Sequence, residues 1–206
     1  MPKSRSATSA EASAPLPVHP LTPDRWDDLM DLFGPERGAN SGCWCMWTRL
    51  PGKVWNAMTR EERRDAFRRI VEEGPPPGLL AYEQGRAVGW VAVGPRTSLT
   101  RFNAGKASRP LDAPGDPVPS SIQAVSCFYV RGGCRGRGLT SRLAEAAVAF
   151  ARRSGAAAVE ACAIEPEKRL QWGEGFVGLA TVFRLLGFRE VARRSPRRPL
   201  MRLDLR

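Results

Sequence analysis

Histidine is scarce in this chain, whose 206 residues contain only one, His19. The five cysteines include one closely spaced pair, Cys43-x-Cys45, and no second pair of that kind. A structural zinc site takes four Cys or His ligands, usually in two closely spaced pairs. The sequence therefore predicts no metal site.

Long hydrophobic runs are also missing. No segment has the roughly 18 consecutive apolar residues that a membrane-spanning helix needs. Residues 1–18 are rich in Ser, Ala and Pro and lack the apolar core of a signal peptide, so we expect a disordered lead-in. We expect residues 19–206 to form a single domain. An odd number of cysteines in a chain of this size favours reduced thiols and a cytoplasmic location over a disulfide framework.

Acidic residues are few relative to basic ones: 21 Asp and Glu stand against 32 Lys and Arg, a formal charge of +11. One interpretation is a solvated basic surface, and the other is a surface that neutralises nucleic-acid phosphates. The arginines are dispersed and accompany no recognised nucleic-acid-binding motif. We therefore favour the solvated surface and do not expect a nucleic-acid partner.

Hydrophobic periodicity and turn residues predict alternating helices and strands. The predicted helices are 23–33, 59–73, 139–153 and 177–186, and the predicted strands are 79–82, 87–93, 122–130, 157–164, 188–192 and 200–205. Residues 35–56 and 94–119 are expected to be loops. The order of elements predicts an α+β fold with a mixed, mostly antiparallel sheet and helices on both faces.

Residues 128–143 carry the most functional information. A strand leads into a turn with Gly132, Gly133, Gly136 and Gly138, and an amphipathic helix follows at once. The N-terminus of a helix has unpaired N–H donors and a partial positive charge, so it suits a phosphate. Glycines let a diphosphate approach the main chain closely. This stretch is therefore predicted to bind a pyrophosphate.

Two common phosphate-binding motifs do not fit. A P-loop needs Gly-Lys-Ser or Gly-Lys-Thr after its first glycine, and neither tripeptide occurs in the chain. A dinucleotide-binding fingerprint needs a third glycine where Ser141 stands, and a downstream acidic residue that is missing.

The pattern Arg135-x-x-Gly138-x-Thr140 instead resembles the pyrophosphate loop (Arg/Gln-x-x-Gly-x-Gly/Ala) of the GNAT superfamily of acyl-CoA-dependent N-acetyltransferases. Leu186-Gly187-Phe188 resembles the Leu-Gly-Phe that ends a helix in that superfamily. The resemblance covers about residues 79–205 and implies a GNAT-like sheet. It also implies transfer of an acetyl group from acetyl-CoA to a primary amine of a small molecule or peptide, by direct attack in a ternary complex.

The resemblance also implies where the acetyl-CoA binds. In this fold the pantetheine arm lies along the strand before the loop, between two strands that splay apart. The implied acetyl-CoA-binding residues are Phe128, Tyr129, Val130, Arg135, Gly136, Arg137, Gly138, Leu139, Thr140, Ser141 and Phe183. Thr140 replaces the last Gly/Ala of the loop. Phe183 stands where many members have a tyrosine that protonates the leaving thiolate, so we expect it to pack beside the CoA sulfur. Cys162, Thr181 or water could supply that proton instead.

Carboxylates near the splayed strands are the candidates for a general base. Glu160 lies in the second of these strands and Glu165 at its end, where burial could raise a carboxyl pKa toward neutrality. Both are more often surface carboxylates, and some members of the superfamily need no side-chain base.

The acceptor is expected over the loop between the first two helices, where Trp44, Cys45 and Trp47 lie, with Trp90 on a central strand. These aromatics could form an apolar wall or a cation–π face, although at least two are expected in the core. Two alternatives to the enzyme remain: an acyl-CoA-binding module without catalytic activity, and a nucleic-acid-binding protein. A homodimer is also left open.

Overall fold

The computed structural model describes residues 16–34, 42–111, 119–168, 170 and 174–205. Residues 1–15 of the expected lead-in lie outside this range. Val18, the last residue of that lead-in, opens a short strand, β1 (Val18–Pro20), that the sequence did not predict. Three residues are too few for a periodicity of two to be visible, which explains the omission.

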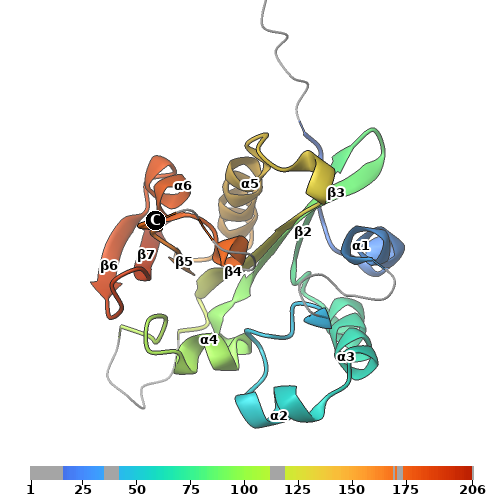
Figure 1. Ribbon diagram of the computed structural model, residues 1–206, viewed down its shortest axis with the longest axis horizontal. Coiled ribbons are helices and arrows are strands. Elements are labelled where there is room, and N and C mark those ends of the chain that lie inside the picture. The colour runs from blue at the N-terminus through green and yellow to red at the C-terminus, as the bar shows by residue number, and fades with distance from the viewer. Residues whose placement is uncertain (1–15, 35–41, 112–118, 169, 171–173, 206) are drawn as a thin grey trace, which may run out of the picture.

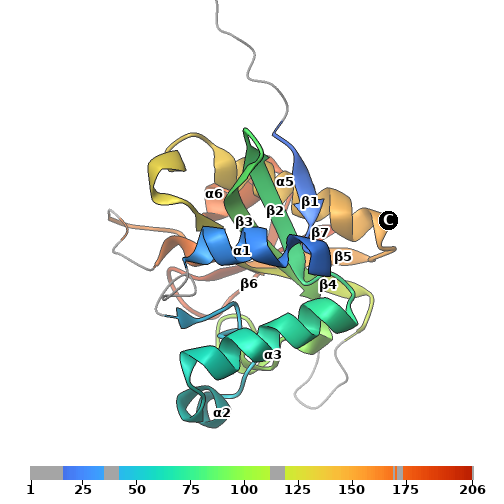
Figure 2. The same ribbon diagram turned by 90° about the vertical axis from the view of Figure 1, so that its right-hand side faces the viewer.

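The strands form one sheet of seven (Figures 1 and 2). The six others are β2 (Gly78–Glu83), β3 (Arg86–Pro95), β4 (Ile122–Val130), β5 (Ala158–Cys162), β6 (Arg189–Arg193) and β7 (Pro199–Asp204). Their order in the sheet is β1-β2-β3-β4-β5-β7-β6. Only β4 and β5 pair in parallel; the other neighbours are antiparallel. The predicted α+β fold with a mixed, mostly antiparallel sheet is confirmed.

The α-helices are α1 (Trp26–Phe33), α2 (Gly52–Ala57), α3 (Arg60–Glu73), α4 (Thr100–Ala104), α5 (Leu139–Arg153) and α6 (Ala180–Leu185). Short 3-10 turns are η1 (Pro23–Arg25), η3 (Arg96–Ser98), η4 (Gly132–Cys134) and η5 (Gly175–Val177). The capping box of α3 forms as its sequence predicts: the Glu62 amide donates to the Thr59 hydroxyl, and the Glu62 carboxylate accepts from the Thr59 amide. The helix predicted from residue 177 is instead η5 followed by α6.

Two predicted loops contain helices. The short helix α2 begins in the predicted loop 35–56 and ends one residue beyond it. The predicted loop 94–119 contains η3 and α4. Both helices are too short to show an apolar stripe. Buried side chains hold η3 and α4 in place instead, namely Arg96 in η3 and Phe102 in α4. Residues 35–41 and 112–118 of these loops lie outside the described range.

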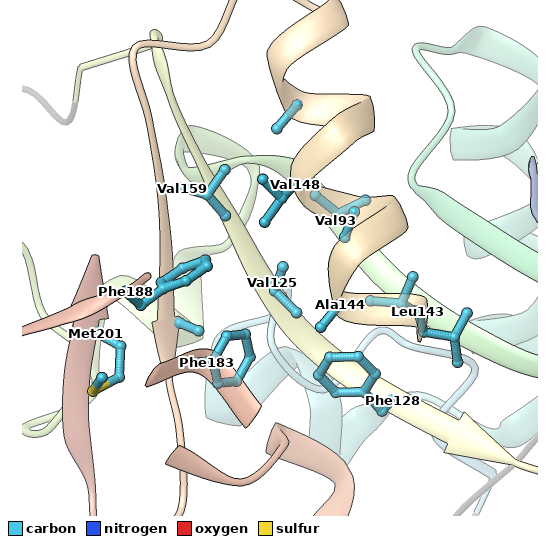
Figure 3. Close-up of a cluster of buried hydrophobic side chains, with 14 of the residues drawn as sticks. Val93, Val125, Phe128, Leu143, Ala144, Val148, Val159, Phe183, Phe188 and Met201 are labelled. Carbon is cyan, nitrogen blue, oxygen red and sulfur yellow. The ribbon is translucent and has the colours of Figure 1, made fainter. Parts of the chain in front are cut away.

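The sheet carries a hydrophobic core on each face. One core packs α5 and α6 on the sheet through residues such as Leu143, Ala144 and Phe183 (Figure 3). The other packs α1 and α3 on the opposite face through Leu29, Phe67 and their neighbours (Figure 2). The prediction of helices on both faces is therefore confirmed, and the loop between β4 and α5 is fixed at both of its ends.

Candidate active site

The loop between β4 and α5 has free main-chain donors at its surface. Gly138 is the N-cap of α5 and has no side-chain cap. Its carbonyl accepts from the amides of Ser141 and Arg142, at 3.1 and 3.3 Å. Within the described residues, the amides of residues 136–140 donate to no main-chain carbonyl. These N–H groups are the donors that a helix N-terminus offers to an anion.

Two glycines shape this loop. Gly136 and Gly138 have φ values of 77° and 74°, in the left-handed region that glycine adopts without a steric penalty. A Cβ placed on either residue meets no protein atom within 4 Å, so the space over these amides is open. Open space, exposed amides and the start of a 15-residue helix fit a diphosphate.

Three arginines in and next to this loop form hydrogen bonds or ion pairs with neighbouring parts of the chain. Arg135 donates from Nε to the Val130 carbonyl, at 3.1 Å. Arg137 forms an exposed ion pair with Glu83, at 2.9 Å. Arg131 pairs with Asp31 at 2.7 Å and also donates to the Ala87 carbonyl. Their positive charge stays beside the loop, where it favours an anion.

The strands β4 and β5 separate halfway along β4. Their last pair is Val125 with Ala161, whereas β4 continues to Val130. The Arg131 amide donates to the Val88 carbonyl, and Tyr129 lies opposite Trp90. Because hydrogen-bonding direction alternates along an antiparallel strand, the main-chain groups of Phe128 and Val130 point away from β3, toward the side that β5 has left.

The side chains of Phe128 and Phe183 lie in the core beside this opening (Figure 3). Their ring centroids are 6.2 Å apart, and Phe183 also contacts Phe188 at 5.1 Å. Phe183 is fully buried. The segment 178–180 hydrogen-bonds to Ile164 beyond the end of β5, and Gly178 lies against both rings. Phe183 therefore has a packing role, and its contact with a CoA sulfur stays a prediction.

Glu160 does not have the environment of a free base. Its side chain is buried and forms ion pairs with Arg96 and with Arg202, the latter at 3.1 Å. Two guanidinium groups around one carboxylate occupy its oxygens. This arrangement points to a structural role in joining η3, β5 and β7.

Glu165 also differs from the expectation. Its carboxylate pairs with Arg184 and Arg193, both at 2.7 Å. Hydrogen bonds from these two guanidinium groups lower the pKa of Glu165, so the predicted rise toward neutrality is wrong in direction. A carboxylate with a lowered pKa is a weaker base than a free one.

The segment that contains Trp44, Cys45 and Trp47 lies on the face of the sheet that carries α1 and α3. We call it the tryptophan-rich segment. Trp44, Cys45 and Trp90 are buried, and Trp90 Nε1 donates to Cys45 Sγ at 2.9 Å. Burial raises the pKa of the Cys45 thiol well above its ordinary value, so the thiol stays protonated. Only Trp47 of the expected acceptor-binding residues is exposed, at 41%. The other three support this segment from the core.

Backbone strain marks the same segment. Trp44 and Cys45 have φ values of 45° and 54°, consecutive left-handed residues that are not glycine. Such residues cost about 1–2 kcal/mol each and persist where the surrounding structure holds them. Thr48 follows three residues after Cys45, and its hydroxyl donates to the Ser126 hydroxyl of β4 at 3.4 Å.

Three residues near Thr48 belong to no sequence motif. Arg49, Ser98 and Arg101 come from two segments that the sequence separates by about 50 residues, and only the fold brings them together. Single arginines and serines in loops carry no periodicity, so sequence analysis could not select them.

Comparison with known proteins agrees with this geometry. The model of the acetyltransferase (GNAT) family matches residues 26–171, and the chain belongs to that family. It is therefore an acetyltransferase of the GNAT family. No curated protein sequence matches it.

Solved structures share the fold at low sequence identity. An N-acetyltransferase from Staphylococcus aureus Mu50 is 14% identical with a TM-score of 0.54, over 94% of this chain and 100% of that one. A GCN5-related N-acetyltransferase from Kribbella flavida is 18% identical with a TM-score of 0.54, over 93% and 98%. A putative acetyltransferase from Salmonella typhimurium with its cofactor acetyl-CoA is 16% identical with a TM-score of 0.52, over 94% and 95%.

Two kinds of feature are missing from the described residues. No helix in that part of the chain is long and apolar enough to cross a membrane. Nor do the same residues contain a group of three or more His, Cys, Asp or Glu side chains that could hold a metal ion.

Proposed function

We propose that this protein transfers the acetyl group of acetyl-CoA to a primary amine of a small molecule or peptide, by direct attack in a ternary complex. The observation that carries the proposal is the row of amides at residues 136–140, which lack main-chain acceptors in the described structure and lie at the N-terminus of α5. They would bind the diphosphate, and residues 135–141 would form its loop.

The main chain of β4 would orient the thioester. Phe128 and Val130 direct their N–H and C=O groups to the side of β4 that β5 leaves open. An extended pantetheine arm could pair with those groups as an additional strand. This role uses only the main chain, so it is compatible with the burial of the Phe128 ring.

The chemistry needs one new bond and one broken bond. The amine nitrogen attacks the thioester carbon, the C–S bond breaks, and the CoA thiolate takes up a proton. The amine loses its proton to water in this proposal, because Glu160 and Glu165 are both engaged by arginines. Phe183 has no proton to give, so water also protonates the thiolate.

A covalent acetyl-enzyme is a poor alternative. Cys45 is buried, its thiol pKa is raised, and its sulfur accepts from Trp90. A protonated, enclosed thiol is a weak nucleophile. Direct transfer therefore needs fewer changes to the structure than a two-step route through this cysteine.

Release of free CoA thiol from acetyl-CoA, measured across a panel of primary amines, tests the proposal. Amine-dependent release with intersecting double-reciprocal plots is the expected result. CoA binding in calorimetry without release by any amine would favour the alternative of a catalytically silent acyl-CoA-binding module. Parallel plots would argue for a covalent intermediate.

A further inference from the structure

Two segments form one wall on the face of the sheet that carries α1 and α3. The first is residues 48–50, and the second runs from η3 into α4. The Phe102 amide donates to the Thr48 carbonyl at 3.1 Å. Arg101 Nε donates to the Leu50 carbonyl at 3.0 Å. These cross-links fix both segments relative to each other.

Arg49 lies in this wall without an acidic partner. It is half-buried, and its Nη1 donates to the Ser98 hydroxyl at 3.0 Å. A guanidinium has five N–H donors and carries a full charge. No carboxylate of the described residues forms an ion pair with it. Burial lowers the pKa of Arg49, because the charged guanidinium is partly removed from water.

Other arginines of the chain show the contrast. Arg86, Arg137 and Arg193 are more exposed at the surface, and each pairs with a carboxylate of this chain within 2.9 Å. Arg96, which is buried, pairs with Glu160. These four arginines, buried and exposed, each pair with an acid, while the printed side-chain partner of Arg49 within the described residues is a neutral hydroxyl.

A second cation stands in the same wall. The guanidinium of Arg101 lies 3.8 Å from the centroid of the Trp47 ring. Within the described residues it likewise has no carboxylate ion pair. Arg49 and Arg101 are the chain neighbours of Thr48 and Phe102, the two residues that the main-chain hydrogen bond between the segments joins.

This surface lies next to the reactive end of the proposed acetyl-CoA site. The Thr48 hydroxyl contacts Ser126 of β4, at 3.4 Å. Ser126 lies two residues before Phe128, whose main chain faces the opening between β4 and β5. An acceptor seated against Arg49 would therefore be near the strand that orients the thioester.

We propose that Arg49, with Arg101 beside it, binds a carboxylate on the acceptor, which makes the acceptor an amino acid or a similar small amine that carries a negative charge. The inference rests on the proposed function and names the substrate class of that same site. A carboxylate accepts two parallel N–H bonds from one guanidinium, which fixes orientation as well as affinity. The amine at the other end of such a small molecule is then presented to the thioester.

The test compares each of the common amino acids with its carboxamide, which keeps the amine and removes the charge. The wild-type protein should acetylate at least one amino acid with a KM about tenfold or more below that of its amide. Arg49→Gln should remove this preference by raising the KM for the amino acid, while the KM for acetyl-CoA and for the amide stays unchanged. Arg64→Gln is the matched control, because Arg64 is a half-buried arginine of α3 that pairs with its neighbour Asp65, and it should change neither value.

A second variant tests the proposal independently if Arg49→Gln does not fold. Ser98→Ala removes only the hydroxyl that holds Arg49 and should raise the KM for the same amino acid by a smaller factor. Equal KM values for acid and amide in the wild type would overturn the proposal. So would an unchanged preference in a folded Arg49→Gln protein.

A binding measurement separates this proposal from the proposed function. N-acetyl amino acids and their amides are titrated calorimetrically into the CoA-saturated protein. If no amine releases thiol but the N-acetyl amino acid binds more tightly than its amide in an Arg49-dependent way, the function fails and the anion site stands. If amines are acetylated without any preference for a carboxylate, the function stands and the anion site is refuted.

Discussion

Gly138→Val is the substitution that tests the diphosphate loop most directly. Gly138 caps α5 at φ 74°, and a side chain there would project into the open space over the amides. A valine in the left-handed region costs about 1–2 kcal/mol of folding free energy. In the bound state it would also block at least one charge-assisted hydrogen bond to a phosphate, a loss of about 1.5–3 kcal/mol. Binding of CoA should therefore weaken by roughly 10- to 150-fold.

Gly155→Val is a matched control at the other end of the same helix. Gly155 has φ 73°, and a Cβ placed on it also meets no protein atom within 4 Å. The two variants should therefore lose similar unfolding free energy in urea, whereas only Gly138→Val should lose CoA affinity in calorimetry. Unchanged CoA affinity in Gly138→Val, or an equal loss in both, would refute the placement of the diphosphate.

Three further predictions follow from single contacts. Glu160→Gln should lower the free energy of unfolding by about 3–5 kcal/mol, because Arg96 is then buried without its carboxylate; a stable variant that loses only kcat would instead indicate a catalytic base. Arg86 and Arg131 lower the pKa of Asp31 from 3.8 to about 2, so the carboxylate stabilises the fold above about pH 4 and loses this effect as pH falls toward 2. Asp31→Asn should therefore lower the free energy of unfolding in urea by a few tenths to about 1 kcal/mol at pH 7, by less at pH 2, and by almost nothing well below pH 2; a difference that persists below pH 2 would contradict this assignment. Trp47→Ala should raise the KM for the acceptor far more than the KM for acetyl-CoA, since its ring is exposed beside Arg101; equal effects on both would mean a structural role.

The sequence determined the strand, loop and helix that carry the proposed acetyl-CoA site. The predicted strand 122–130 and helix 139–153 coincide with β4 and α5. Their signals are local: hydrophobic side chains repeat with the period of each element, and glycines stand where φ is positive. The resemblance to the GNAT pyrophosphate loop depends on the same short stretch, so family and fold were accessible without coordinates.

Tertiary structure alone decided which partners Glu160 and Glu165 have and which residues lie around Arg49. Glu160 meets Arg96 and Arg202, and Glu165 meets Arg184 and Arg193, through contacts that join separate elements. A pKa depends on charges and burial within a few ångströms in space, and linear sequence does not contain those distances. Arg49 reaches Ser98 for the same reason: pairing of β3 with β4 and packing of the first loop bring them together. Periodicity encodes which face of an element is buried, whereas the partner of a single polar side chain is set only when the whole sheet has formed.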